Sequence, residues 1–278
     1  MIDQAQTDKF KEILELCKNT LVIFPETKDL DLFLASYSLY SFLVKSDARL
    51  LSPKFKLKVP SEIVDFVENK NVETELGKEN LLISFPYQED QVDNVSYYIG
   101  EQDKRFYLTI KPKKGVAPLN SNNLEFSYAG SQADLLILLG VEDLESLEQL
   151  YFAYESLYKG TNNHLVTINN FIPDFGNLNL DVSPTSSYCE ALFYLLKDLD
   201  QKDGDFLAKS NIPTLLLYGI ESKSRGLQSA EADAETFLAV AELLQLGAIR
   251  LFKLDASATE PVKKLVKTSV KPQVHLVK

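Results

Sequence analysis

Side chains that could bind an anion or act on one stand at few positions in this sequence. Ser186 and Ser187 directly precede a helical pattern, where they could present amides to a phosphate, although capping of that helix is the favoured role. The two histidines, His164 and His275, offer no arrangement for a nucleophilic triad. Glycine-rich phosphate loops of the GxGxxG and P-loop types are absent. The residues taken alone therefore do not support nucleophilic catalysis.

Lysines and aromatic residues form a second group of candidates, for nucleic-acid binding. The lysines are Lys111, Lys113, Lys114, Lys263, Lys264, Lys267 and Lys271, and a solvated surface is the default interpretation of such runs. Tyr97, Tyr98, Phe106 and Tyr107 lie on presumed strands, where they could stack on bases, but packing against a core is favoured. The net charge of −11 argues against non-specific binding of nucleic acid.

Length and composition favour a globular protein. The chain has 278 residues, of which 45% are hydrophobic and 25% charged, enough for one large α/β domain. Cys17 and Cys189 lie in helical patterns, so we expect core thiols and no disulfide framework. The first residues lack the features of a signal peptide, and no apolar run reaches the roughly 18 residues of a membrane span. We therefore expect a cytoplasmic protein with no membrane partner.

Hydrophobic periodicity predicts strands alternating with helices. Apolar runs predict buried strands at 20–24, 134–140 and 164–168, and helical spacing predicts helices at 3–18, 32–45, 143–158, 187–199, 204–210, 213–222 and 231–246. This alternation is typical of an α/β fold, a mostly parallel sheet with helices on both faces. We expect one domain at 1–255, a β-rich insertion at about 72–128 with a hairpin turn at 101–104, and a basic tail at 256–278. Ligands of such sheets bind where strands end, here after Phe24, Leu139 and Ile168.

Four segments, in order along the chain, resemble the four motifs of the DHH phosphoesterase family. LVIFPETKDLDLFLASYSLYSFL is similar to the first motif, and Asp29 and Asp31 match its two aspartates, whereas Pro25 falls at its histidine. DLLILLGVEDLESL is similar to the strand that ends in a metal-bridging aspartate, a position that Gly140 takes here. The resemblance covers most of residues 1–250 apart from the insertion, and it implies a DHH-like core.

The other two motifs lie in the second half of the chain. HLVTINNFIPDFGNLNLDVSPTSSYCEALFYLL resembles the Asp-His-His segment, with Asn169, Asn170 and Phe171 in place of those three residues. PTLLLYGIESKSRGLQSAEADAETFLAVAELLQLGA resembles the Gly-Ile-x-x-Asp-Thr-Gly segment, with Lys223 at the aspartate and Arg225 at the last glycine. Many family members carry a further, substrate-gripping domain after this core, and we do not expect one in this chain.

The resemblance implies a chemistry that the substitutions contradict. Active members hold two divalent ions, usually manganese, that activate water against a phosphoester. Proline, glycine and asparagine are poor replacements for carboxylate and imidazole ligands, and a lysine adds positive charge where metals must lie. We hypothesise that Lys223 is the counter-charge to Asp29 and Asp31. The alternative of equal weight is that Asp29 or Asp31 caps the following helix and that Lys223 points into solvent.

The sequence therefore predicts a catalytically inactive, DHH-like pseudo-phosphoesterase that acts as a binding or scaffold protein. Its remnant cleft would comprise Asp29, Asp31, Gly140, Asn169, Asn170 and Lys223, with Ser186, Ser187 and Arg225 as anion contacts. We expect no cofactor, no enzymatic activity, and a protein partner or self-association. One alternative is a residual phosphoesterase for nucleotides or short oligonucleotides that uses manganese on Asp29 and Asp31. Another is binding of single-stranded nucleic acid.

Overall fold

A parallel sheet forms the centre of the fold. The computed structural model describes residues 2–44, 47–68, 71–77, 80–87, 91–129, 133–160, 163–200 and 206–253. The sheet has the strand order β10–β9–β8–β1–β2–β3, and all neighbouring strands are parallel. Its strands are β1 (Thr20–Ile23), β2 (Arg49–Leu51), β3 (Val72–Glu73), β8 (Leu135–Leu139), β9 (His164–Asn169) and β10 (Leu178–Asp181).

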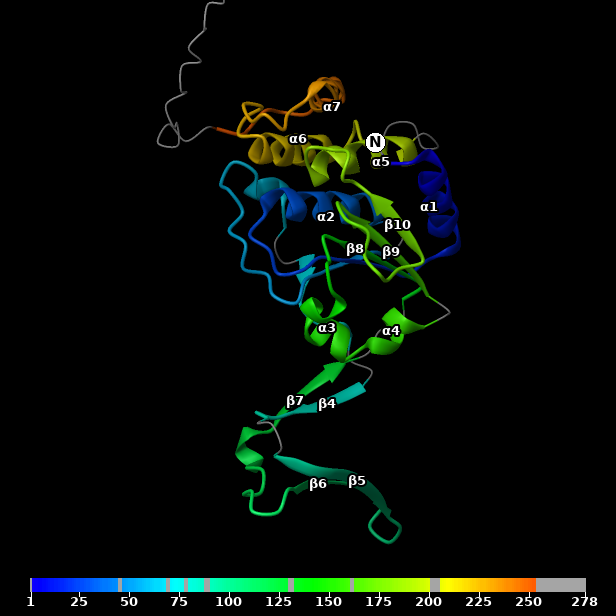
Figure 1. Ribbon diagram of the computed structural model, residues 1–278, viewed down its shortest axis with the longest axis vertical. Coiled ribbons are helices and arrows are strands. Elements are labelled where there is room, and N and C mark those ends of the chain that lie inside the picture. The colour runs from blue at the N-terminus through cyan, green and yellow to red at the C-terminus, as the bar shows by residue number, and fades with distance from the viewer. Residues whose placement is uncertain are drawn as a thin grey trace, which may run out of the picture.

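Helices cover both faces of this sheet (Figure 1). One side carries α1 (Gln4–Leu16), α2 (Leu30–Leu43), α5 (Tyr188–Asp200), α6 (Ile212–Lys223) and α7 (Ala234–Gln245). The other side carries η5 (Leu144–Leu147), α3 (Gln149–Phe152) and α4 (Glu155–Lys159). Because side chains of a strand alternate in direction, Val22 joins the first core and Leu21 and Ile23 join the second. Burial on both sides explains why β1 and β8 are continuous apolar runs.

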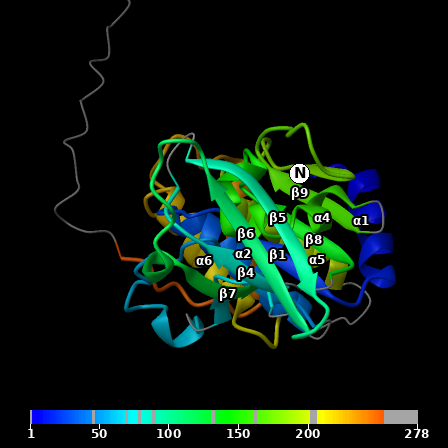
Figure 2. The ribbon, with the colours of Figure 1, turned by 90° about the horizontal axis from the view of Figure 1, so that it is seen from below.

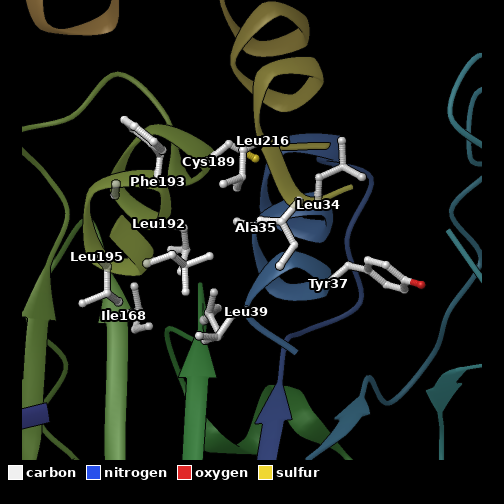
Figure 3. Packing of buried hydrophobic residues seen from close by; sticks show 14 of the residues in the cluster. Leu34, Ala35, Tyr37, Leu39, Ile168, Cys189, Leu192, Phe193, Leu195 and Leu216 are labelled. Carbon is white, nitrogen blue, oxygen red and sulfur yellow. The ribbon is translucent and has the colours of Figure 1, made fainter. Parts of the chain in front are cut away.

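The larger core lies between the sheet and helices α2, α5 and α6. Leu39 of α2 and Leu192 and Leu195 of α5 gather near Ile168 of β9 (Figure 3). These four side chains are almost completely buried, and each such aliphatic side chain contributes about 1.5–3 kcal/mol to folding. This packing fixes α2 and α5 against one face of the sheet.

The predicted α/β fold class, with its mostly parallel sheet, is confirmed, and the predicted strands at 20–24, 134–140 and 164–168 are β1, β8 and β9. The continuous helix predicted at 143–158 is wrong. Glu148 takes a left-handed φ of 49° and its carboxylate pairs with Lys54, so the segment breaks into η5, α3 and α4. Residues 206–210 form turns where a helix was expected. β2 and β10 were not predicted, because strands of three and four residues give little periodicity.

An antiparallel arm is inserted between β3 and β8. β4 (Asn80–Ser84) pairs with β7 (Glu125–Ala129), and β5 (Val92–Gly100) pairs with β6 (Arg105–Pro112). A short 3₁₀ helix, η4 (Ser121–Asn123), precedes β7, and the predicted hairpin turn at 101–104 is confirmed. The arm projects from the side of the sheet that carries α3 and α4, and Figure 2 views it from its far end.

Two expectations about the insertion are corrected. It was placed from about residue 72, but Val72 and Glu73 form β3 of the main sheet, where the Glu73 carboxylate accepts a hydrogen bond from Arg49 Nε at 3.0 Å. The antiparallel part therefore begins with β4. Core packing is also wrong for Tyr97, Tyr98 and Phe106, which are more than half exposed, whereas Tyr107 is partly buried.

Two other expectations concern the basic tail and membrane-spanning segments. The basic tail at 256–278, with Lys263, Lys264, Lys267, Lys271 and His275, lies outside the described residues. Within the described ranges, none of the helices has the length and apolar character needed to cross a membrane.

The root of the arm offers a test of one buried hydrogen bond. The Tyr154 hydroxyl donates to the carbonyl of Leu76 at 2.6 Å, beside the start of the arm. Tyr154→Phe leaves this carbonyl without that donor, so we expect the free energy of unfolding to fall by about 1–2 kcal/mol in urea titrations. Tyr158→Phe is the matched control, because the buried Tyr158 hydroxyl has no hydrogen-bond partner among the described residues. This change should leave stability unchanged or raise it slightly. Equal losses in the two variants would contradict the role of the Leu76 contact.

Candidate functional site

The ends of the central strands bring the expected residues to one edge of the sheet. β8 lies between β1 and β9, so the segments that follow Ile23, Leu139 and Asn169 emerge side by side. α2 starts shortly after β1, with Asp29 as its N-cap and Asp31 in its first turn. α5 and α6 pack against α2 and against each other. The candidate site is thus a junction of three helices above the strand ends.

Asp29 uses its two carboxylate oxygens for two different purposes. Oδ1 accepts a hydrogen bond from the backbone N–H of Asp31 at 3.0 Å, which caps α2. Oδ2 accepts from Nζ of Lys223, the last residue of α6, at 2.7 Å. The two interpretations drawn from the sequence, helix cap and ion pair, are therefore both present in one side chain. The pair is partly solvated, with 40% of the Lys223 side chain and 36% of the Asp29 side chain exposed.

The charge of Asp29 also acts on Lys223. Partial burial of the ammonium lowers its pKa, but the hydrogen bond and the negative charge of Asp29 outweigh this and raise the pKa of Lys223 above its usual value. Lys223 is therefore a permanent cation at neutral pH. An ammonium in this position repels a divalent cation that approaches Asp29.

Asp31 is a buried carboxylate, 1% exposed, that binds the start of α5. Its Oδ2 accepts from the backbone N–H of Tyr188 at 2.7 Å, and its Oδ1 accepts from that of Cys189 at 2.9 Å. The positive end of the α5 dipole favours this charge. Burial nevertheless raises the pKa of Asp31 to about 6, and the amide hydrogen bonds only partly offset it. Burial, with the nearby Asp31 charge, likewise raises the pKa of the Cys189 thiol well above its usual value.

The serine pair ahead of α5 makes capping contacts. Ser187 Oγ accepts from the backbone N–H of Glu190 at 3.0 Å, and the Ser186 hydroxyl donates to the buried Glu190 carboxylate, as does Thr236 of α7. The Tyr188 and Cys189 amides, which could have faced a phosphate, are bound to Asp31 instead. The capping role that the sequence favoured is therefore the one that the structure contains.

Gly140 is a crowded position. It has a left-handed φ of 63°, and a Cβ built on it would lie 2.6 Å from Cδ2 of Leu32 and 2.9 Å from its Cδ1. Leu32 of α2 therefore fills the space that any side chain at 140 would enter. The apolar side chain replaces the carboxylate that the family resemblance expects there.

Asn169 and Asn170, at the end of β9, make hydrogen bonds to Val141 after β8 and to Tyr188 of α5. Asn169 is buried, and its Nδ2 donates to the carbonyl of Val141 at 3.2 Å, while its Oδ1 has no hydrogen-bond partner among the described residues. Asn170 is exposed and accepts from the Tyr188 hydroxyl at 3.3 Å. Arg225, in contrast, has an exposed side chain and makes no ion pair with a described residue.

Close helix packing completes the junction. Gly219 matches the glycine of the Gly-Ile segment in the family resemblance, but its packing role was not predicted from the sequence. A Cβ on Gly219 of α6 would lie 2.2 Å from Cys189 Sγ and 3.4 Å from Asp31 Oδ1. Only a glycine lets α6 approach the starts of α5 and α2 this closely. A glycine inside an otherwise apolar helix was the available signal. Helical spacing places Leu32 on the apolar side of its helix, but neither its contact with Gly140 nor the amide partners of Asp31 gave a signal in the sequence.

The carboxylates of Asp29 and Asp31 are engaged by donors of the protein itself. All four carboxylate oxygens of Asp29 and Asp31 accept a hydrogen bond, one of them from an ammonium. In the part of the chain that the structure describes, no group of three or more His, Cys, Asp or Glu side chains is placed to hold a metal ion. Two divalent ions need several anionic ligands to offset their mutual repulsion.

The Gly140–Leu32 contact predicts an unusually costly glycine substitution. Gly140→Ala places a Cβ at a positive φ and against Leu32, so we expect the free energy of unfolding to fall by about 2–4 kcal/mol. Gly247→Ala is the matched control, because Gly247 has a φ of 92° but no atom within 4 Å of its Cβ position. It should show only the backbone cost of about 1–2 kcal/mol. Urea titrations measure both, and equal losses would contradict the steric role of Leu32.

The raised pKa of Asp31 predicts a pH dependence of stability. The folded protein holds the Asp31 proton more tightly than the unfolded chain, so this group favours folding below about pH 4 and loses that contribution as pH rises through about 6. The change is on the order of 3 kcal/mol. Relative to the unmodified chain, Asp31→Asn should therefore gain about this much stability between pH 4 and pH 7, measured by urea unfolding. A difference that moves in the opposite direction would show that the amides of α5 outweigh the burial.

The comparisons with known proteins bear on the fold. No family model matches the chain, and no curated protein matches its sequence. The structure is similar to that of an exopolyphosphatase-related protein from Bacteroides fragilis, with a TM-score of 0.56 and 15% sequence identity. The match covers 90% of this chain and 58% of the other, so the chain spans less than two thirds of that protein's length. At this identity the likeness shows a shared α/β fold.

Proposed function

We propose that this chain is a binding protein built on a phosphoesterase-like fold and that it does not carry out two-metal hydrolysis. The observation that supports this most directly is the ion pair of Lys223 with Asp29, 2.7 Å between Nζ and Oδ2. The neighbour of similar fold is named as exopolyphosphatase-related, which makes phosphoryl chemistry the natural comparison for this chain. In such chemistry the metal lowers the pKa of the attacking water and stabilises the charged phosphoryl oxygens.

The electrostatics of the junction support the loss of that chemistry. A metal on Asp29 would lie beside the Lys223 ammonium, whose charge repels it. A metal on Asp31 would share its buried oxygens with two backbone amides of α5, and any loss of these contacts would cost about 1–3 kcal/mol for each amide. Leu32 also fills the space next to Gly140, where the resemblance would require a third carboxylate.

The two alternatives have weaker support. A residual manganese-dependent phosphoesterase acting on nucleotides or short oligonucleotides needs metal ions at Asp29 and Asp31 in spite of these contacts. Single-stranded nucleic-acid binding is opposed by the net charge of −11, and one of the candidate lysines, Lys111, is paired with Asp93 at 2.7 Å. Binding through a protein interface needs neither a metal ion at these carboxylates nor a basic surface.

Isothermal titration with MnCl₂ tests the proposal on the full chain. We expect no binding by the unmodified protein and no manganese-dependent hydrolysis of bis(p-nitrophenyl) phosphate. Lys223→Asp removes the ammonium and adds a carboxylate beside Asp29, so this variant should gain weak binding of one ion, roughly in the millimolar range.

Lys197→Asp is the control, because Lys197 is also paired with a carboxylate, that of Glu242, but lies away from Asp29 and Asp31. This variant should bind no manganese. Two equivalents of manganese on the unmodified chain, together with phosphate release from nucleotides or oligonucleotides, would overturn the proposal in favour of the hydrolase.

A further inference from the structure

The hairpin of the arm has two chemically different faces. Side chains of paired residues share a face, and Val95, Tyr97 and Ile99 of β5 are paired with Ile110, Leu108 and Phe106 of β6. These six side chains are all apolar or aromatic. The other face carries the pairs Asn94–Lys111, Ser96–Thr109 and Tyr98–Tyr107, and is mostly polar. The alternation is that of a strand pair with one face made for burial.

No described part of the chain covers the apolar face. Tyr97 is 69% exposed and Phe106 is 63% exposed, and the two rings stack on each other with centroids 5.3 Å apart. Val95, Ile99 and Leu108 are also exposed. Together these side chains expose on the order of 600 Å², about as much as the largest apolar patch of a typical monomer and close to one side of a stable interface.

An amphipathic hairpin of this kind is stabilised when its apolar face is covered. An isolated two-stranded hairpin is at best marginally stable in water, and stability needs further strands or packing of the apolar face. The arm nevertheless extends away from the body of the protein as strands of nine and eight residues (Figure 1). A cover over this face would therefore stabilise the hairpin, while the body of the protein has its own buried core.

We propose that this cover is a second copy of this chain, whose hairpin packs its apolar face against the first around a two-fold axis. Charge supports this choice. Residues 80–129 carry five Lys or Arg and six Asp or Glu, a net −1, whereas the whole chain carries −11. Two acidic bodies repel, but the nearly neutral arms can meet while they hold the bodies apart. A symmetric contact needs only one self-complementary surface, which the apolar face provides.

In this dimer the partner of the proposed binding protein is a second copy of the same chain. Only the biological role of the dimer rests on the proposed function, because the dimer itself is inferred from the hairpin and not from the metal-ligand positions. Manganese binding by the chain would overturn the proposed function and leave the dimer untouched, and a monomeric chain that binds no metal would do the reverse.

Sedimentation velocity and light scattering of the full chain test the dimer. We expect a mass of twice 31.3 kDa that falls to the monomer on dilution but persists in high salt. Phe106→Lys with Leu108→Lys places two charges on the apolar face, and we expect the dimer dissociation constant to rise by about 100-fold or more. Because both side chains are exposed in the monomer, its fold should survive, as thermal melting by circular dichroism will show.

The matched control places the same charges on the other face of the same strands. Ser96→Lys with Thr109→Lys should leave the dissociation constant within about threefold of the unmodified value, since these residues lie outside the contact. A chain that stays monomeric up to about 100 µM would overturn the proposal and would point to residues 254–278 or a different partner as the cover. So would a dimer that tolerates both apolar-face lysines. Salt-sensitive binding of a single-stranded oligonucleotide to a monomeric chain would instead assign the aromatic face to nucleic acid.

Discussion

The junction above the strand ends depends on one buried carboxylate. Asp31 leaves water almost completely, and an ion in that position is tolerated only when hydrogen bonds and dipoles replace its hydration. Two amides at the start of α5 do so, 157 and 158 residues further along the chain. Gly219 then allows α6 to pack against the same point. The relative positions of α2, α5 and α6 therefore follow from where the oxygens of Asp31 can find donors.

Both carboxylates of this junction have a structural role. The oxygens of Asp31 bind the amides at the start of α5 and hold that helix in place, and Oδ1 of Asp29 caps α2. Lys223 supplies Asp29 with the positive charge that a metal would otherwise provide, but it offers no Lewis acidity and no bound water. Leu32 is close-packed beside Gly140. This packing excludes water from that position and also stabilises α2.

The sequence predicts those parts of the fold in which a local pattern carries the information. Long apolar runs identified β1, β8 and β9, and the turn at 101–104 identified the hairpin, because each signal lies within a few residues. The two roles of Asp29 were also foreseen, as alternatives, since a cap is local and the lysine lay in a recognisable motif. The partners of Asp31 and the position of Leu32 could not be foreseen, because they result from tertiary packing. The break at Glu148 overrode a helical period for the same reason.

The arm shows a different limit of sequence patterns. Alternation predicts that one face of a strand will be buried, but it does not say whether the cover is the same chain or another one. For Tyr97 and Phe106 the sequence left a choice between stacking on bases and packing in a core, of which the core was favoured, and their exposure contradicts that expectation. The arm leaves the sheet on the side of α3 and α4, whereas Asp31 lies among helices on the opposite side. A contact made through the arm would thus leave the junction of α2, α5 and α6 free, so an interface on one side and a ligand on the other do not exclude each other.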